Sequence, residues 1–364
     1  MMKNIIPRKI KVAIVGCGRI CKKHILAIIS ENERCELVAI CDNNQKKIED
    51  ISDFYNSQLK EKNFPLKHLI KFNDYEELIN SKINNKIDID LIVLATPSGL
   101  HPIQTKIAAK SGINVCTEKP MAINLADAKE MIKVCKESEV KLFVIKQNRL
   151  NPTLQILKKK VEENKFGNIG IVDINVFWQR PQSYYDQDKW RGTKDLDGGA
   201  LLNQASHYVD LLEWIIGPLD GVYANISTIS RNIEVEDTAV IQMKWKSGAL
   251  GSMSVTMITY PKNIEGSITI IGDKGSAKVG GIAVNEFEYS FFEEDINTNL
   301  KDYNYQTESV YGFGHNFYYQ NMFDNLISNT KPICDGESGL SSIKIINAAY
   351  KSAEEQRFIK LSSI

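Results

Sequence analysis

Two short stretches of the sequence contain the side chains best suited to acid–base chemistry. The first is Thr117-Glu118-Lys119-Pro120, and the second is Asn203-Gln204-Ala205-Ser206-His207-Tyr208-Val209-Asp210. A histidine, or a lysine whose pKa is lowered by burial, can take up and return a proton near neutral pH. Lys119 and His207 together are therefore equipped to remove the proton of an alcohol, which is half of an oxidation. The other half needs an acceptor for a hydride.

The second stretch predicts a helix with polar side chains on one face. Asn203, His207 and Asp210 stand at positions i, i+4 and i+7, a spacing that brings them to the same side of a helix. We expect Asp210 to orient the ring of His207, and Asn203 to bind a substrate hydroxyl or amide. The preceding Gly198-Gly199 pair would allow close approach to the backbone. The alternative is a histidine that only packs within the fold.

Lys119 follows a predicted strand, so it lies at the carboxyl edge of the expected sheet, where open α/β sheets bind ligands. It could polarise a substrate hydroxyl or act as the base. We expect Glu118 to position a cofactor, and Pro120 to follow a cis peptide that turns Lys119 toward the ligand crevice. The plainer alternative is a surface lysine ahead of a helix-starting proline.

A cofactor is indicated by the N-terminal run VAIVGCGRIC, which predicts a buried strand, a tight turn and a helix. Gly16 permits the turn and Gly18 lets the backbone approach a pyrophosphate. Arg19 and Ile20 begin the helix, whose N–H groups attract anionic oxygens. Cys21 occupies the place of the third glycine of this fingerprint, so a tight turn without a ligand stays an alternative.

Asp42 ends the second predicted strand, where a carboxylate hydrogen-bonds the ribose diol of a bound adenosine. It would repel the 2′-phosphate of NADP, and no arginine follows it, so NAD is the expected cofactor. Thr96, Pro97 and His101 follow a later strand and are expected beside the cofactor. His101 could instead only cap the next helix.

The order of predicted elements gives these motifs a scaffold. Residues 9–149 alternate short buried strands with helical stretches, which is typical of a doubly wound parallel sheet. Runs of period 2 from Val222 to about Val279 predict antiparallel strands, and helices are expected near Asn316–Ile327 and Leu340–Glu355. The fold class is therefore α/β, with a Rossmann domain at 9–149 and an α/β domain with a large open, mostly antiparallel sheet at 150–364. We expect the C-terminal helix to pack back toward the first domain.

More local predictions concern single segments. The five strands expected in the first domain are Lys11–Val15, Glu36–Cys41, Ile89–Ala95, Asn114–Cys116 and Lys141–Ile145. The polar stretch Ser57–His68 is expected to be a surface insertion, Gln179–Gly198 a long polar-aromatic loop, and Ala200–Ile215 one helix.

Composition argues against several classes of function. With 45 basic and 45 acidic residues, no net charge recruits nucleic acid or an anionic membrane. The first eight residues have no long apolar core or cleavage site, and no apolar run approaches the roughly 20 residues of a spanning helix. We therefore expect a cytoplasmic protein. The seven cysteines lack paired spacings, so we expect reduced thiols and no metal site.

These motifs resemble the glucose–fructose oxidoreductase / inositol dehydrogenase (Gfo/Idh/MocA) family of NAD(P)-dependent sugar oxidoreductases. The residues that carry the resemblance are Gly16 to Ile20, Glu118-Lys119-Pro120, Gly198-Gly199, and His207 with Asp210. The resemblance implies a Rossmann domain, then an α/β domain whose open sheet forms contacts in a homo-oligomer, with a tetramer favoured. It also implies Lys119 and His207 as the catalytic pair.

Longer stretches are similar to one subgroup, the bacterial UDP-N-acetylglucosaminuronate 3-dehydrogenases of O-antigen, lipopolysaccharide and surface-polysaccharide assembly. These stretches are 177–193, 203–208 and 259–263. The subgroup implies oxidation of the sugar C3 hydroxyl to a 3-keto sugar nucleotide, which an aminotransferase then aminates. In some members the cofactor is reoxidised by 2-oxoglutarate. Polyol dehydrogenases of the family carry aspartate where this chain has Asn203, which suits an anionic substrate.

A UDP-uronate carries two phosphates and a carboxylate, and arginine suits such oxygens. The residues expected to bind this substrate are Lys119, Arg149, Arg180, Tyr184, Trp190, Arg191, Asn203 and His207. The loop residues among them could instead order the loop or an oligomer contact. Other substrates stay open, namely UDP-N-acetylglucosamine and an inositol or other polyol, as does a non-catalytic sensor of NAD and sugar nucleotide.

Overall fold

The structure is a computed structural model that describes residues 8–293, 300–307, 312 and 314–364. Residues 1–7, which we expected to carry no targeting signal, lie outside the described residues. The chain divides into two compact units, each with its own β-sheet. Unit 1 contains the chain up to Met121 with Asp127–Ile145 and His315–Glu337. Unit 2 contains Ala122–Ala126, Lys146–Gly314 and Ser338–Ile364.

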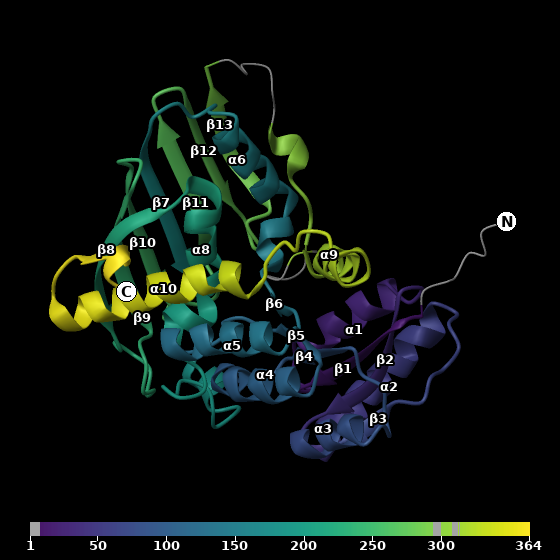
Figure 1. The fold of residues 1–364 in the computed structure, drawn as a ribbon. Helices are drawn as coiled ribbons and strands as arrows, with labels where there is room; N and C mark the ends of the chain where they lie inside the picture. The colour runs from purple at the N-terminus through teal and green to yellow at the C-terminus, as the bar shows by residue number, and fades with distance from the viewer. Residues whose placement is uncertain (1–7, 294–299, 308–311, 313) are drawn as a thin grey trace. The chain divides into compact units, whose positions relative to one another are not determined.

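Unit 1 is built on a parallel sheet with the strand order β3-β2-β1-β4-β5-β6 (Figure 1). The strands are β1 (Ile10–Val15), β2 (Cys35–Cys41), β3 (Ile70–Phe72), β4 (Leu91–Leu94), β5 (Asn114–Thr117) and β6 (Leu142–Val144). All residues of β4 and β6 are buried, because helices cover both faces of a parallel sheet. The doubly wound fold and the five expected strands are confirmed. The short β3 was not expected.

The helices that connect these strands are α1 (Cys21–Ser30), α2 (Gln45–Glu61), α3 (Tyr75–Ile83), α4 (His101–Lys110) and α5 (Leu125–Glu137). Helix α2 begins where the side chain of Asn44 accepts a hydrogen bond from the backbone N–H of Lys47. It is longer than expected. Residues 57–61, which we assigned to a surface insertion, form its end because Tyr55 and Leu59 continue its buried apolar face.

A segment from late in the sequence completes unit 1. Helix α9 (Gly314–Ser328) belongs to this unit from His315 onward. The hydroxyl of Tyr318 in α9 donates to the carbonyl of Val144 in β6 at 2.6 Å. Unit 1 therefore includes a segment that returns to it from late in the sequence.

Unit 2 is built on a sheet with the strand order β13-β12-β11-β7-β10-β9-β8-β14. Strands β7 and β10 are parallel, and the other neighbouring pairs are antiparallel. This confirms the open, mostly antiparallel sheet. The strands are β7 (Ile169–Phe177), β8 (Leu219–Ser227), β9 (Thr238–Trp245), β10 (Leu250–Thr256), β11 (Glu265–Gly272), β12 (Gly275–Gly280), β13 (Glu286–Phe292) and β14 (Ile359–Lys360).

The two faces of this sheet differ. In β9, Ala239, Ile241, Met243 and Trp245 are buried, while the residues between them are exposed. Such alternation means that one face packs against a core and the other does not. Helices of the unit lie over the buried face (Figure 1): α6 (Pro152–Glu162), α8 (Ser206–Leu211) and α10 (Gly336–Glu355). Ser352 of α10 accepts a hydrogen bond from the backbone N–H of Ala224 in β8 at 3.0 Å.

The helix that we predicted as one piece is irregular. It consists of the π-helical segment η3 (Ala200–Gln204), the helix α8, and a second π-helical segment, η4 (Leu212–Ile216). Such π segments are rare and are frequent at functional sites. The expected loop before it contains one short helix, α7 (Gln182–Tyr185).

Within the described part of the chain, no helix is both long enough and apolar enough to cross a membrane. All seven cysteines are buried and free, as expected for reduced thiols. No cluster of metal-ligating side chains was found in the described ranges.

Candidate active site

The turn after β1 in unit 1 fits a dinucleotide. Gly16 has φ +98°, and a Cβ there would overlap the carbonyl of Ala95, so this position requires glycine. At Gly18, by contrast, no described atom lies within 4 Å of the place that a Cβ would take. This leaves room for a ligand to approach the backbone just before α1. Arg19 is exposed, Ile20 is half-buried, and no side chain in the described part of the chain caps the start of α1.

Asp42, at the end of β2, is tied to this turn. Its Oδ2 accepts from the backbone N–H of Cys17 at 2.7 Å, and its Oδ1 accepts from the N–H of Asn44 at 2.9 Å. The carboxylate is half-buried and fixed beside the glycine turn. This arrangement fits the ribose diol of NAD, as the sequence predicts.

His101 joins two loops at the carboxyl edge of the sheet. Its Nδ1 lies 2.9 Å from the carbonyl of Pro120, and its Nε2 lies 3.0 Å from the carbonyl of Thr96. Burial lowers the pKa of His101, against the opposing effect of the two carbonyls. The peptide between Lys119 and Pro120 is cis, as predicted. His101 thus connects the two loops that carry Thr96, Pro97 and Lys119.

Glu118 lies in a buried polar cluster of unit 1. Its Oε1 is 3.2 Å from His24 Nε2 and 3.8 Å from His315 Nε2, and its Oε2 accepts from the backbone N–H of Lys119 at 3.2 Å. Burial opposes ionisation, yet hydrogen bonds and charges of the two histidines lower the pKa of Glu118 well below its ordinary value. Lys119 itself is half-buried. The expected contact of Glu118 with a cofactor stays a prediction.

His207 in unit 2 lies against the turn η2 (Gln147–Leu150), which also carries Arg149. The amide Nε2 of Gln147 is 3.1 Å from His207 Nε2, and both residues are buried. Arg149, also in η2, donates to both carboxylate oxygens of Asp210. The expectation that Asp210 orients the ring of His207 stays a prediction.

The Asp210 carboxylate lies between two cations. Arg149 approaches at 2.7 Å, and the ammonium of Lys146 lies 3.6 Å away. Burial opposes ionisation of Asp210, but the charges of Lys146 and Arg149 outweigh it and lower the pKa of Asp210. Arg149 also donates to Ser338. The expected contact of Arg149 with substrate stays a prediction.

Four of the expected substrate-binding residues come together in unit 2. The guanidinium carbon of Arg180 lies 5.4 Å from the centre of the Tyr184 ring, and that of Arg191 lies 4.5 Å from the same centre. Arg191 also lies 4.4 Å from the centre of the Trp190 ring and donates to the Tyr184 hydroxyl at 2.7 Å. Two guanidinium groups held by aromatic rings form a surface suited to phosphate or carboxylate oxygens.

Asn203 lies next to this group. Gln204 connects the two, because its Nε2 donates to Tyr184 (3.1 Å) and to Asn203 Oδ1 (3.2 Å), while its Oε1 accepts from Arg180 (2.8 Å). The amide of Asn203 donates to Asp197, a buried carboxylate that also accepts from the N–H of Gly192 at 2.6 Å.

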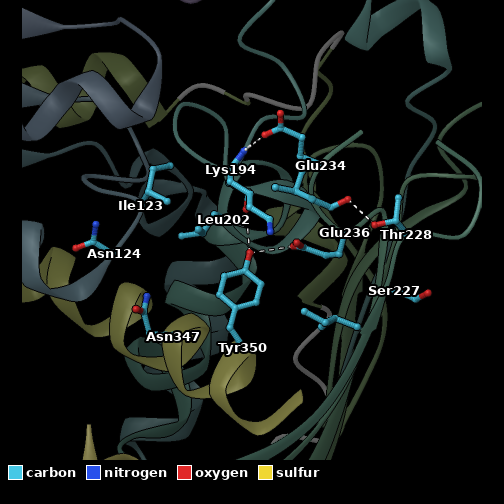
Figure 2. Close-up of a pocket in the computed structure, with 13 residues that line it drawn as sticks. Ile123, Asn124, Lys194, Leu202, Ser227, Thr228, Glu234, Glu236, Asn347 and Tyr350 are labelled. Carbon is cyan, nitrogen blue, oxygen red and sulfur yellow. Dashed lines mark hydrogen bonds between the residues drawn. The ribbon is translucent and has the colours of Figure 1, made fainter. Parts of the chain in front are cut away.

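A cavity of about 550 Å³ lies elsewhere in unit 2, and its walls include Leu202 of η3, Asn347 and Tyr350 (Figure 2). Glu236 accepts hydrogen bonds from the backbone N–H of Leu201 at 2.9 Å and from the hydroxyl of Tyr350 at 3.0 Å. A Cβ at Gly199 would overlap Glu236, which accounts for one glycine of the pair. Burial raises the pKa of Glu236 to about 7. Glu236 therefore supports the start of the segment that carries Asn203.

Sequence reasoning missed Gln147, Lys146 and Glu236. One signal was available for the first two: the polar run Lys146-Gln147-Asn148-Arg149 directly follows a buried strand, at an edge where ligands bind. Glu236 had no signal, because its partners Leu201 and Tyr350 are far away in the sequence.

Comparison with protein-family models adds two matches. Residues 10–146 match the NAD-binding Rossmann fold of an oxidoreductase family, and residues 158–361 match the C-terminal α/β domain of the same family. Together the two matches cover most of the chain.

Solved structures similar to the chain include two complexes. One is the WlbA dehydrogenase from Bordetella pertussis with NADH and UDP-GlcNAcA, which is 46% identical with a TM-score of 0.88 over 98% of this chain and 99% of that one. The other is the WlbA dehydrogenase from Chromobacterium violaceum with the same two ligands, at 44% identity and a TM-score of 0.85 over 98% and 97%. A curated relative, myo-inositol 2-dehydrogenase from Thermotoga maritima, is 26% identical over 97% of this chain and 99% of its own length.

Proposed function

The chain belongs to the Gfo/Idh/MocA family of oxidoreductases and is an NAD-dependent dehydrogenase, and on this basis we propose its substrate. It oxidises the C3 hydroxyl of UDP-N-acetylglucosaminuronic acid to a 3-keto sugar nucleotide. One observation carries this proposal: two proteins that bind UDP-GlcNAcA with NADH are similar to this chain over nearly its whole length, at 44% and 46% identity.

The chemistry of unit 2 supports an anionic substrate. Arg180 and Arg191 flank Tyr184, and Trp190 offers a second ring beside Arg191. Guanidinium groups pair with phosphate and carboxylate oxygens in a bidentate manner, and aromatic faces stack on sugars or bases. We propose these four residues, with Arg149 and Asn203, as the substrate-binding set. A neutral polyol has no anionic oxygens with which the two arginines could pair.

Lys119 and His207 are the proposed catalytic residues. One of them removes the C3 hydroxyl proton, and the other hydrogen-bonds the same oxygen as negative charge develops on it. The C3–H bond breaks with its electron pair as the carbonyl forms, and the hydroxyl proton goes to Lys119 or His207. Bound NAD supplies the acceptor for the hydride. Asp42 and the Gly16–Gly18 turn would hold NAD. The other residues of the proposed cofactor site are Arg19, Ile20, Thr96, Pro97, His101, Glu118 and Lys119.

We propose that the reaction serves O-antigen and lipopolysaccharide biosynthesis, where an aminotransferase would consume the 3-keto product. Reoxidation of bound NADH by 2-oxoglutarate is part of the same proposal. It predicts that a preparation reduced by the sugar nucleotide loses its NADH absorbance when 2-oxoglutarate is added.

A homo-oligomer, with a tetramer favoured, is also proposed. Three apolar side chains lie side by side on the open face of the sheet in unit 2: Ile171 (45% exposed) is in register with Leu250 (53%) and Ile271 (44%). An exposed apolar row of this kind is suited to burial against another subunit. Light scattering of the protein and of Leu250→Asp would test this, since the variant should dissociate.

A second candidate function keeps the chemistry and changes the substrate. The relation to myo-inositol 2-dehydrogenase, at 26% identity, favours a polyol as the alternative, and UDP-N-acetylglucosamine is a further one. Initial rates of NADH formation with each of the three compounds would distinguish them. Activity with UDP-N-acetylglucosaminuronate alone supports the proposal. A preference for the inositol, or no turnover with any of the three, would overturn it, and the latter would favour a sensor.

A further inference from the structure

The contact between Gln147 and His207 has a chemical consequence for the proposed reaction. The two Nε2 atoms are 3.1 Å apart. Gln147 is 2% exposed and His207 is 8% exposed, so water can compete little for this contact. An amide nitrogen only donates hydrogen bonds. With the amide oriented as it is in this structure, Nε2 of His207 accepts, and the ring is then neutral with its proton on Nδ1.

Residues on both sides of Gln147 in the sequence are fixed by buried contacts. Lys146 donates to Ser342 at 2.8 Å and lies 3.6 Å from Asp210, and Arg149 is bound to Asp210 through two hydrogen bonds. The carbonyl of Gln147 packs against Gly314, where a Cβ would overlap it. The position of Gln147 is therefore set by buried charge pairs as well as by its own hydrogen bond.

Asp210 belongs to the same helix as His207, one turn later. The two residues three apart lie on neighbouring positions of the helix surface. The ion pairs to Asp210 from Lys146, just before η2, and from Arg149, within η2, thus join α8 to this turn.

The amide can serve the ring in both protonation states. In the arrangement described, Gln147 Oε1 is buried and has no hydrogen-bond partner among the described residues. If His207 gains a proton on Nε2, a half-turn of the amide presents Oε1 as the acceptor for that N–H. An apolar side chain of the same size could serve neither state.

We infer that Gln147 is a positioning residue for the proton-transfer step: it holds Nε2 of His207 while no substrate is bound, yields that lone pair to the substrate hydroxyl, and can accept from the Nε2–H after product leaves. This rests on the proposed function only in the claim that His207 handles the substrate proton. The effect of Gln147 on the ring can be measured without turnover.

Two variants of Gln147 test the inference. Gln147→Glu keeps the shape and adds a negative charge, which favours the charged ring. Gln147→Met keeps the size and removes the hydrogen bond. Gln320→Glu, on an exposed side chain of α9, is the matched control for adding one carboxylate. Histidine rings labelled with 13C at Cε1 would be titrated by NMR, with the His207 signal assigned by its loss in His207→Asn.

We expect Gln147→Glu to raise the pKa of His207 by about one unit or more and to move the acidic limb of the kcat/KM profile by the same amount. Gln147→Met should lower kcat by about tenfold or more without changing the KM for NAD, and Gln320→Glu should change nothing. If Gln147 only fills space, both variants alter thermal stability and neither moves the His207 titration or the pH profile, and this would overturn the inference.

Failure of the proposed function would look different. If Gln147→Glu shifts the titration of His207 but His207→Asn retains full turnover, the pairing is supported while His207 is excluded as the proton-transfer residue. An unshifted titration in Gln147→Glu, whatever the activity, overturns the pairing itself.

Discussion

The guanidinium of Arg149 donates to both carboxylate oxygens of Asp210, with both hydrogen bonds at 2.7 Å. Both side chains are buried, at 6% and 2% exposure. The pair joins the turn that follows the last strand of the parallel sheet to the helix that carries His207. Residues that are 61 positions apart in the sequence thus determine where the proposed catalytic ring lies.

Removing one partner of this pair should be costly. Arg149→Met leaves Asp210 buried with Lys146 as its remaining cation, and we expect a loss of about 3 kcal/mol or more in the free energy of unfolding. Urea denaturation would measure it. Lys133→Met is the control, because Lys133 is 62% exposed and pairs with Glu130 at 3.8 Å, and its loss should cost less than about 1 kcal/mol. Equal effects of the two substitutions would contradict this account of the pair.

Lys119 is expected to contribute far more to turnover than to the affinity for the cofactor. Lys119→Met should lower kcat by a factor of about 10² to 10⁴. The Kd for NADH, measured by fluorescence, should stay within about twofold of that of the parent protein, because His101 and Glu118 hold the loops around Lys119. Lys189→Met, on an exposed side chain of the unit 2 loop, is the matched control for losing a lysine. Full turnover in Lys119→Met would remove Lys119 from the mechanism.

Asp42 is expected to determine the choice of cofactor. Asp42→Asn keeps an oxygen that can accept from the N–H of Cys17 but loses the negative charge. We therefore expect the KM for NAD to rise about tenfold. The ratio of kcat/KM for NAD to kcat/KM for NADP should fall. Asp42→Ala should also disturb the turn itself. Steady-state rates with both cofactors give the result, and an unaltered NAD preference in both variants would rule out this role.

The stability of Glu236→Gln relative to the parent protein should depend on pH. Because burial raises the pKa of Glu236 from 4.5 to about 7, the folded protein favours the neutral acid. The resulting stabilisation is fully present below pH 4.5 and is lost as the pH rises to about 7. Glu236→Gln mimics the neutral acid, so its stability relative to the parent protein should increase by about 3 kcal/mol across this range.

Denaturation of the parent protein and of Glu236→Gln at pH 5 and pH 8 would measure this change. Glu234→Gln is the control, because Glu234 is exposed in the same loop and should show no such trend. A stability difference that is constant with pH would show that Glu236 titrates as an ordinary carboxyl.

The sequence predicted the parallel sheet well because its strands are short, buried and separated by helices of regular spacing. It also predicted the two glycines of the turn and the place of Asp42, since these follow directly from the first and second strands. The predicted continuous helix at Ala200–Ile215 was wrong in detail. Its π-helical segments depend on contacts such as that of Glu236 with Leu201, which periodicity does not reveal.

The interior of the site could not be predicted for the same reason. Helical spacing placed Asp210 near His207, but no local pattern indicated that Asp210 also pairs with Arg149 from another segment. Gln147, His24 and His315 acquire their roles from contacts across 60 or more residues. Local patterns identify which side chains could do chemistry, and tertiary contacts decide which of them meet.

The most direct test of the proposed function follows the hydrogen on C3. UDP-N-acetylglucosaminuronate with deuterium at C3 would be mixed with the protein and NAD, and the reduced cofactor would be analysed by mass spectrometry. The account predicts NADH that carries one deuterium, formed together with a 3-keto sugar nucleotide. Reduced cofactor without deuterium would place the oxidation at another carbon, and no reduction at all would contradict the proposed substrate.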